Sequence, residues 1–305
     1  MSGFIRPGYN SAVMEAVIEY LVLGMLQGIT EWLPLSSEGV IVLAKAGLFG
    51  GGSLQDVVRQ ALFLHLGTFL AALLYFRRDV VDILKALPSF IAQGCMHPRR
   101  GWSVANGEAG MRRFIVFLAL ATVVSGVLGG AAFMAMEGLD MAIAGQAITL
   151  AVGMLLVFTA VLQLRATVRP VPVGDGRRLT GGSKGEGELI KRDGLLLGVC
   201  QGLAALPGVS RSGITVSALL LRGFDKTRAL RFSFIMSLPI VLAGNILLNL
   251  DRAVLRVEAL AGLVSAFFFG ILTIHALIRL SRRVNFGYFV LGFGVLVLIS
   301  GLLLV

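Results

Sequence analysis

Residues 201–215 read Gln-Gly-Leu-Ala-Ala-Leu-Pro-Gly-Val-Ser-Arg-Ser-Gly-Ile-Thr and interrupt an apolar stretch in the second half of the chain. Residues 27–39 read Gln-Gly-Ile-Thr-Glu-Trp-Leu-Pro-Leu-Ser-Ser-Glu-Gly and interrupt another apolar stretch near the N-terminus. Both segments follow the order Gln-Gly, Leu-Pro, Ser, Gly, and their spacing differs by one residue on each side of the proline. This similarity indicates an internal repeat in which a related polar segment breaks each half of the chain.

The rest of the sequence is typical of a membrane protein. Of its 305 residues 56% are hydrophobic and 14% are charged, and the mean hydropathy is +0.87, which lies outside the range of soluble domains. A chain in lipid must satisfy its backbone hydrogen bonds internally, so we expect an all-α polytopic membrane protein with six transmembrane helices. The apolar runs long enough to cross about 30 Å of hydrocarbon are 58–76, 113–135, 141–164, 231–250, 257–279 and 286–305.

The basic residues are distributed in a way that favours membrane orientation over nucleic-acid binding. They lie in loops between the expected spans and do not form one stripe with interleaved aromatic residues. Loops 77–112 and 165–192 are rich in Lys and Arg, whereas turn 136–140 has none and turn 251–256 has only two. The positive-inside rule therefore places the two basic loops in the cytoplasm and the two turns outside.

The Pro-, Gly-, Ser- and charge-rich linker 165–192 divides the chain into a first repeat, 1–164, and a second repeat, 193–305. Segment 193–222 begins and ends beside basic residues expected in the cytoplasm, so we predict a re-entrant helical hairpin there. Because the two halves are related by the internal repeat, segment 12–48 is expected to be a second hairpin. The alternative is that this segment crosses the membrane once and that the N-terminus lies in the cytoplasm. Three spans follow each hairpin, which produces an inverted-topology repeat whose hairpin tips meet near the membrane midplane.

The first polar segment places an acid inside an apolar region. Gln27 and Glu31 are four residues apart and share one face of a helix that we expect to end at Pro34. A carboxylate at membrane depth is costly and suggests function, although a position of Glu31 at the headgroup boundary is the alternative. The hydroxyls of Ser36 and Ser37 either cap the following helix or form an anion site with its free N–H groups.

The second polar segment places a cation in the predicted hairpin tip. Arg211 is flanked by Ser210 and Ser212, Gly208 allows backbone N–H groups to approach a ligand closely, and Thr215 adds a further hydroxyl. Arginine prefers phosphate or carboxylate partners, so Arg211 is expected to bind an anion or to pair with the acid of the other hairpin. Together the tips contain the groups needed for phosphoryl transfer on a substrate with a phosphate head and a lipid tail.

On these residues the chain resembles the BacA/UppP family of undecaprenyl-diphosphatases. The first motif of that family, Glu or Gln four residues before Glu and then Pro and a Ser-Ser turn, is matched at 27–37, and the second, Pro-Gly-x-Ser-Arg-Ser-x-x-Thr, at 207–215. The resemblance implies an integral phosphatase that converts undecaprenyl diphosphate to undecaprenyl phosphate and inorganic phosphate and so recycles the lipid carrier of cell-wall synthesis. It also implies the bacterial inner membrane, a cytoplasmic linker and a site that faces the periplasm.

The resemblance also assigns roles to particular residues. It implies that Glu31, Arg211 and a serine of the Ser36-Ser37 turn carry the chemistry, and that a divalent cation, Mg²⁺ or Ca²⁺, lies near Glu31 and Gln27. The residues expected to contact substrate are Gln27, Gly208, Ser210, Ser212 and Thr215. The expected partners are the membrane, an isoprenoid lipid diphosphate and a second copy of the chain in a homodimer, with no nucleic acid.

One departure from the family pattern concerns proton transfer. Many members have a histidine shortly after the Ser-Ser turn, where this chain has Val40. Glu38 or His65 is a candidate to replace it, and Ser37 acting with Glu31 as its base is a third arrangement. If hydrolysis is lost, the alternatives are a polyprenyl-phosphate flippase or transporter, which the inverted hairpins would also suit, and a structural or regulatory membrane protein.

Overall fold

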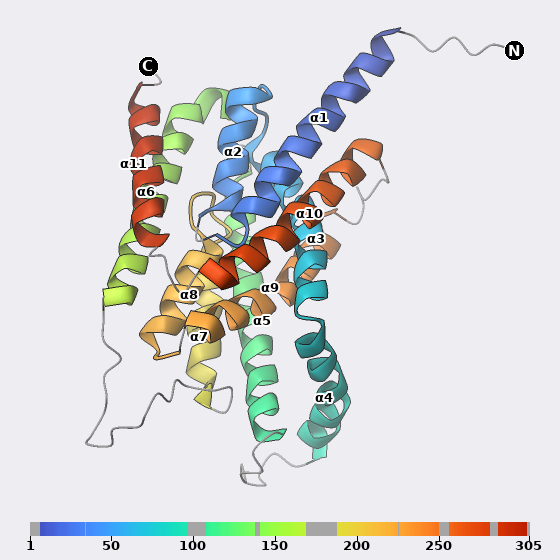
Figure 1. The fold of residues 1–305 in the computed structure, drawn as a ribbon, viewed down its shortest axis with the longest axis vertical. Helices are drawn as coiled ribbons and strands as arrows, with labels where there is room; N and C mark the ends of the chain where they lie inside the picture. Colours follow the sequence, from blue (N-terminus) through green and yellow to red (C-terminus); the bar gives the residue numbers. More distant parts are fainter. Residues whose placement is uncertain are drawn as a thin grey trace, which may run out of the picture.

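The computed structural model describes residues 7–33, 35–96, 108–137, 141–168, 188–224, 226–249, 256–280 and 286–303, and Pro34 lies outside them. Among these residues it contains eleven α-helices (Figure 1). They are α1 (Pro7–Thr30), α2 (Ser37–Leu48), α3 (Leu54–Tyr75), α4 (Arg77–Met96), α5 (Glu108–Ala135), α6 (Met141–Val168), α7 (Lys191–Leu203), α8 (Arg211–Leu221), α9 (Lys226–Asn249), α10 (Val257–Leu280) and α11 (Phe286–Leu303). The all-α prediction is confirmed for the described part of the chain.

Among the described residues five helices are long and apolar enough to cross a membrane, and the chain is therefore a multi-pass membrane protein. The qualifying segments lie in α1, α3, α5, α9 and α10. The last four match expected spans, whereas the segment in α1, Val13–Thr30, falls in the region predicted as the first arm of a hairpin. Within the described residues, α6 and α11 contain the shorter apolar segments Thr149–Leu162 and Val290–Ile299.

The basic region 77–112, expected to be a loop, contains the whole of helix α4 and the start of α5. Helix α4 forms because its residues have a partly buried face that can pack. Val80 and Ile83, three residues apart, pack against the core, and Asp79 forms an ion pair with Arg231 of α9. Charge density marked this region as a loop, but the spacing of its apolar residues favours a helix.

Each broken segment folds into two helices that run back alongside each other. Near the end of α2, Lys45 forms an ion pair with Glu19 of α1. At the end of α8, Arg222 Nε lies 2.6 Å from Asp193 Oδ1 in the first turn of α7. In Figure 1 the N-terminal end of α1 and the C-terminal end of α2 lie toward the upper end of the molecule, whereas α7 begins toward the lower end. The two helix pairs thus point their tips toward each other.

The first arm of each pair packs closely against a long helix from the other half of the chain. Helix α1 packs along α10, and α7 packs along α5. A Cβ at Gly28 would lie 2.7 Å from Ala266 O in α10, and a Cβ at Gly202 would lie 2.6 Å from Leu128 Cβ in α5. Glycine is needed at both places because small residues let membrane helices approach closely.

An aromatic cluster fills the end of the core where α3 ends and α5 begins. The Trp32 and Phe234 rings meet edge to face at 4.8 Å, with Phe76 packed on Phe234 at 6.2 Å. Phe232 continues the cluster to Phe114 at 5.1 Å. The opposite end of the core, where α3 begins and α5 ends, is mostly aliphatic. The buried core therefore has an aromatic end and an aliphatic end along the long axis. Glu31, next to Trp32, lies at the boundary between these two parts of the core.

Candidate active site

The two tips are joined through the hydroxyl of Ser36. Its Oγ accepts hydrogen bonds from Gly39 N at 3.0 Å and from Gly208 N at 2.9 Å. Gly208 has φ +102, which a residue with a side chain rarely adopts, and a Cβ there would lie 2.7 Å from Val152 Cα of α6. A second link runs from Ser212 Oγ to Leu33 O at 2.7 Å. These bonds fix the relative position of the two tips.

The carboxylate of Glu31 is the centre of the joined tips and is 4% exposed. Its Oε1 pairs with Arg211 Nη2 from the second hairpin. Its Oε2 accepts hydrogen bonds from Gln27 Nε2 and from Ser37 Oγ, each at 2.8 Å. Burial of a carboxylate is tolerated here because both oxygens have donors. The carboxylate of Glu31 is therefore buried between the two tips.

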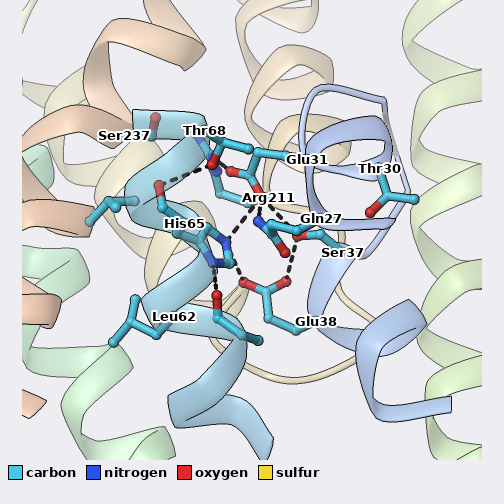
Figure 2. A network of polar contacts seen from close by, with 12 residues as sticks. Gln27, Thr30, Glu31, Ser37, Glu38, Leu62, His65, Thr68, Arg211 and Ser237 are labelled. Atoms are coloured by element: carbon cyan, nitrogen blue, oxygen red, sulfur yellow. Dashed lines mark hydrogen bonds and ion pairs between the residues drawn. The ribbon is translucent and has the colours of Figure 1, made fainter. Parts of the chain in front are cut away.

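Helix α3 adds a histidine to this network (Figure 2). His65 Nε2 lies 3.0 Å from Glu31 Oε2 and 3.3 Å from Glu38 Oε1. Ser37 Oγ lies 3.4 Å from Glu38 Oε2, so the serine lies between the two acids. The structure thus brings together His65 and Glu38, the two side chains considered as replacements for the histidine that the family pattern has at Val40.

The hydrogen bonds of His65 constrain where its protons lie. Nδ1 is 2.7 Å from Ala61 O, and a carbonyl oxygen can only accept, so Nδ1 carries a proton. If the ring is neutral, Nε2 then presents a lone pair to the carboxylates of Glu31 and Glu38. A proton on Nε2, or on one of the two acids, removes this repulsion. The three side chains are close enough to share a proton.

Two buried polar atoms at the site have no hydrogen-bond partner. They are Nη1 of Arg211, a donor, and Oε1 of Gln27, an acceptor. A buried unpaired donor costs about 1–3 kcal/mol, so an Arg211 nitrogen without a partner is expected where a ligand binds. The pair between Arg211 and Glu31 uses only the other nitrogen. Arg211 can consequently hold Glu31 and still contact an anion.

The remaining predicted residues lie in the second tip. Ser210 caps α8 and its Oγ accepts from Gly213 N at 3.0 Å, as Ser36 does for α2. Thr215 Oγ1 lies 2.6 Å from Arg211 O and 2.6 Å from Ser233 Oγ of α9. Ser210, Ser212 and Thr215 are therefore occupied in shaping the tip that presents Arg211.

Sequence reasoning missed residues that support the site from the long helices. Ser233 on α9 is fully buried and bonds Thr215, and Thr68 on α3 donates to His65 O at 3.0 Å. Ser237 lies four residues after Ser233, donates to Phe234 O of its own helix at 2.7 Å and is labelled near Thr68 in Figure 2. Polar residues repeated at helical spacing inside apolar spans were the available indication. They were overlooked because the two motifs accounted for the expected chemistry.

The predicted cation ligands fit only in part. Among the described residues no group of three or more His, Cys, Asp or Glu side chains has the arrangement of a metal site. Both oxygens of Glu31 are held by donors, whereas Oε1 of Gln27 is buried and unpaired. Gln27 thus has an unpaired oxygen to offer to a cation, and the cation expected near Glu31 stays a prediction.

Comparison with known proteins agrees with the motifs. The model of a family described as bacitracin resistance protein BacA matches residues 20–299. The chain belongs to the BacA family. It is 38% identical over 284 residues to an undecaprenyl-diphosphatase of Methanococcoides burtonii, covering 93% of this chain and 97% of that one. It is 37% identical over 294 residues to an undecaprenyl-diphosphatase of Haloarcula marismortui, covering 95% and 99%. The BacA match includes both hairpin tips.

Proposed function

We propose that this protein hydrolyses undecaprenyl diphosphate to undecaprenyl phosphate and inorganic phosphate, and that it thereby recycles the lipid carrier of cell-wall synthesis. Membership of the BacA family and the activity for which its relatives are named support the substrate and the reaction. The observation that carries the proposal is the unpaired, buried Nη1 of Arg211, held beside the Ser37 hydroxyl by a carboxylate that both residues share. Phosphoryl transfer requires a positive charge that lies beside a hydroxyl group, and the hydroxyl has to be hydrogen-bonded to a carboxylate that can take its proton.

Within this proposal the residues divide the work. Arg211 Nη1 and the free N–H groups at the starts of α2 and α8 bind the terminal phosphate. Ser37 attacks phosphorus and passes its proton to Glu31 Oε2, which lies 2.8 Å away. Ser36 is the structural serine of the pair, because its oxygen already accepts two backbone hydrogen bonds.

The divalent cation belongs to the same proposal. Mg²⁺ is usually held by one or two protein oxygens together with substrate phosphates, and the unpaired Oε1 of Gln27 is a fitting protein oxygen. When bound, the cation would neutralise part of the charge on the diphosphate. Gln27 also donates to Glu31, so it would connect the cation site to the acid.

The architecture that we propose is an inverted repeat of 1–164 and 193–305, each formed by a re-entrant hairpin and three spans. In this repeat α1 corresponds to α7, α3 to α9, α5 to α10 and α6 to α11. The packing of α1 on α10 then corresponds to the packing of α7 on α5, and the α6–α11 and α3–α9 pairs each join a helix to its own counterpart, as an inverted repeat requires. The equivalent caps at Ser36 and Ser210 support the same relation. The ion pair that joins the end of α8 to the start of α7 favours a hairpin that returns to its own side.

We also propose that the protein lies in the inner membrane with the linker 165–192 in the cytoplasm and the site open to the outer side. The basic loops support this orientation. The aromatic cluster around Trp32 and Phe234 fills the end of the core that this orientation places toward the cytoplasm. A packed aromatic core on that side leaves the outer side as the route for the diphosphate.

The test is phosphate release from undecaprenyl diphosphate by the purified protein. The variants Glu31→Gln, Ser37→Ala and Arg211→Ala should each lower kcat/KM by about 100-fold or more, as expected when a group that acts in the transition state is removed. Matched controls on the exposed surface are Glu15→Gln, Ser89→Ala and Arg78→Ala, which should retain activity. Release by the wild-type protein that is no faster than by the three site variants would rule out the proposal.

A further inference from the structure

The proposed reaction has an unassigned step, which is protonation of the leaving lipid phosphate. Ser37 and Glu31 account for the attacking hydroxyl and its proton. Arg211 is bound to Glu31, and a guanidinium does not release protons in proteins. The position that carries a histidine in many family members is Val40, whose side chain cannot transfer a proton. The proton donor has to come from another element.

His65 on α3 has the geometry of such a donor. Its Nδ1 is tied to Ala61 O, so only Nε2 is available for exchange, and Nε2 lies 3.0 Å from the oxygen of Glu31 that also binds Ser37. Glu38 Oε1 at 3.3 Å faces the same nitrogen. An imidazole nitrogen in this position can carry a proton and give it up. A histidine that served only packing would not need two acids on one nitrogen.

We propose that His65 is a catalytic residue of this chain and donates the Nε2 proton to the leaving lipid phosphate, in place of the histidine absent at Val40. This assignment rests on the proposed phosphatase function. Glu38 is a positioning residue that, together with Glu31, directs Nε2 into the site. The role therefore moves from the start of α2, where the family motif has it, to the middle of α3.

The steps balance without a further reactant. Ser37 Oγ bonds to the terminal phosphorus and its proton goes to Glu31, while the bond from that phosphorus to the bridging oxygen breaks. The bridging oxygen keeps the electron pair and takes the Nε2 proton, and lipid monophosphate leaves. Glu31 then returns a proton to Nε2 across the 3.0 Å contact. Finally water attacks the phosphoserine, one water proton reaches Ser37 Oγ through Glu31, and inorganic phosphate leaves.

The test replaces the bridging oxygen of the lipid diphosphate by sulfur, because a sulfur leaving group departs without a proton. His65→Ala should lower kcat about 100-fold on the oxygen-bridged substrate and by less than about fivefold on the sulfur-bridged one, since general acid catalysis contributes 10²–10⁴-fold. KM should change little on either substrate. The matched control is His275→Ala, because His275 lies beside Tyr75 in ring contact at 6.5 Å and not at the site.

A second variant, His65→Asn, guards against loss of folding, since the amide nitrogen of asparagine replaces Nδ1 and can donate to Ala61 O but cannot act as an acid. Only variants that keep the wild-type thermal transition in detergent are compared. Equal losses on the oxygen-bridged and sulfur-bridged substrates by a folded variant would overturn the role of His65. Failure of the wild-type protein to release phosphate from either substrate would instead refute the phosphatase function itself, so the two failures are distinguishable.

Discussion

The side-chain oxygen of Ser36 lies 2.9 Å from the amide nitrogen of Gly208, 172 residues away in the sequence. The same oxygen also accepts the amide of Gly39 at the start of its own helix. One hydroxyl therefore caps α2 and joins the two hairpins. The geometry of the candidate site depends on this bond, because Glu31 and Ser37 belong to one tip and Arg211 to the other.

Removal of that hydroxyl should loosen the site. Ser36→Ala leaves two buried N–H groups unpaired, each at a cost of about 1–3 kcal/mol, whereas Ser210→Ala removes only a cap within one helix, at about 1 kcal/mol. We expect Ser36→Ala to lower the thermal transition in detergent further than Ser210→Ala and to reduce phosphate release. Equal destabilisation by the two substitutions would show that Ser36 acts only as a helix cap.

Charge alone should not replace Arg211. Lysine would restore a positive charge near Glu31 but has a single nitrogen, so it cannot hold the carboxylate with one nitrogen and phosphate with another. We expect Arg211→Lys to lower kcat/KM by about 10–100-fold, which corresponds to the loss of one charge-assisted hydrogen bond of about 1.5–3 kcal/mol. Steady-state kinetics measure this directly. Activity within threefold of the wild-type protein would argue that Arg211 serves only to neutralise Glu31.

Close helix packing can be tested with glycine substitutions. Gly28→Ala forces a methyl group to within 2.7 Å of Ala266 O, whereas a Cβ at Gly47 meets nothing within 4 Å. We expect Gly28→Ala to destabilise the protein by about 1–3 kcal/mol, and Gly47→Ala to be neutral or stabilising by up to about 1 kcal/mol. Thermal unfolding of both variants in one detergent gives the comparison. A neutral Gly28→Ala would mean that α1 and α10 separate more easily than their packing indicates.

Orientation can be measured by labelling of single cysteines. In a background without Cys95 and Cys200, a cysteine at Lys184 in the linker should resist an impermeant thiol reagent in intact cells. A cysteine at Glu137, beyond the end of α5, should react with it. Membrane disruption should make both positions reactive. Labelling of position 184 from outside would reverse the proposed orientation.

Much of the fold followed from the sequence because the bilayer restricts the choices. Apolar runs in lipid have to be helices, so α3, α5, α9 and α10 were predicted at nearly their observed bounds. The Pro- and Gly-containing segments marked the ends of α1 and α7 for the same reason. Helix α4 was missed because its charged residues resemble those of a loop. The face that packs against the core is identified only by its contacts, such as the one between Asp79 and Arg231, which lies 152 residues away.

The site was predictable where its chemistry lies within one motif and less so where it lies between elements. Glu31 and Arg211 were identified because a charge inside an apolar segment requires a partner. The choice between Ser36 and Ser37 was open because both follow the same proline, and only the opposite tip shows that Ser36 accepts Gly208 N. His65 was one of several candidates because nothing local relates a histidine on α3 to an acid 34 residues earlier.

Glu31 and Arg211 are 180 residues apart, and this separation has a consequence for biogenesis. While the chain is being inserted, the first hairpin contains a carboxylate whose cationic partner has not yet been synthesised. An ionised acid cannot enter the bilayer interior alone without a large desolvation cost. The Glu31 carboxylate of the first hairpin therefore has to stay hydrated, or be protonated, until the second hairpin has been inserted. The candidate site therefore cannot close before the second hairpin has been synthesised, and a truncated chain that stops before residue 211 should remain accessible to water at Glu31.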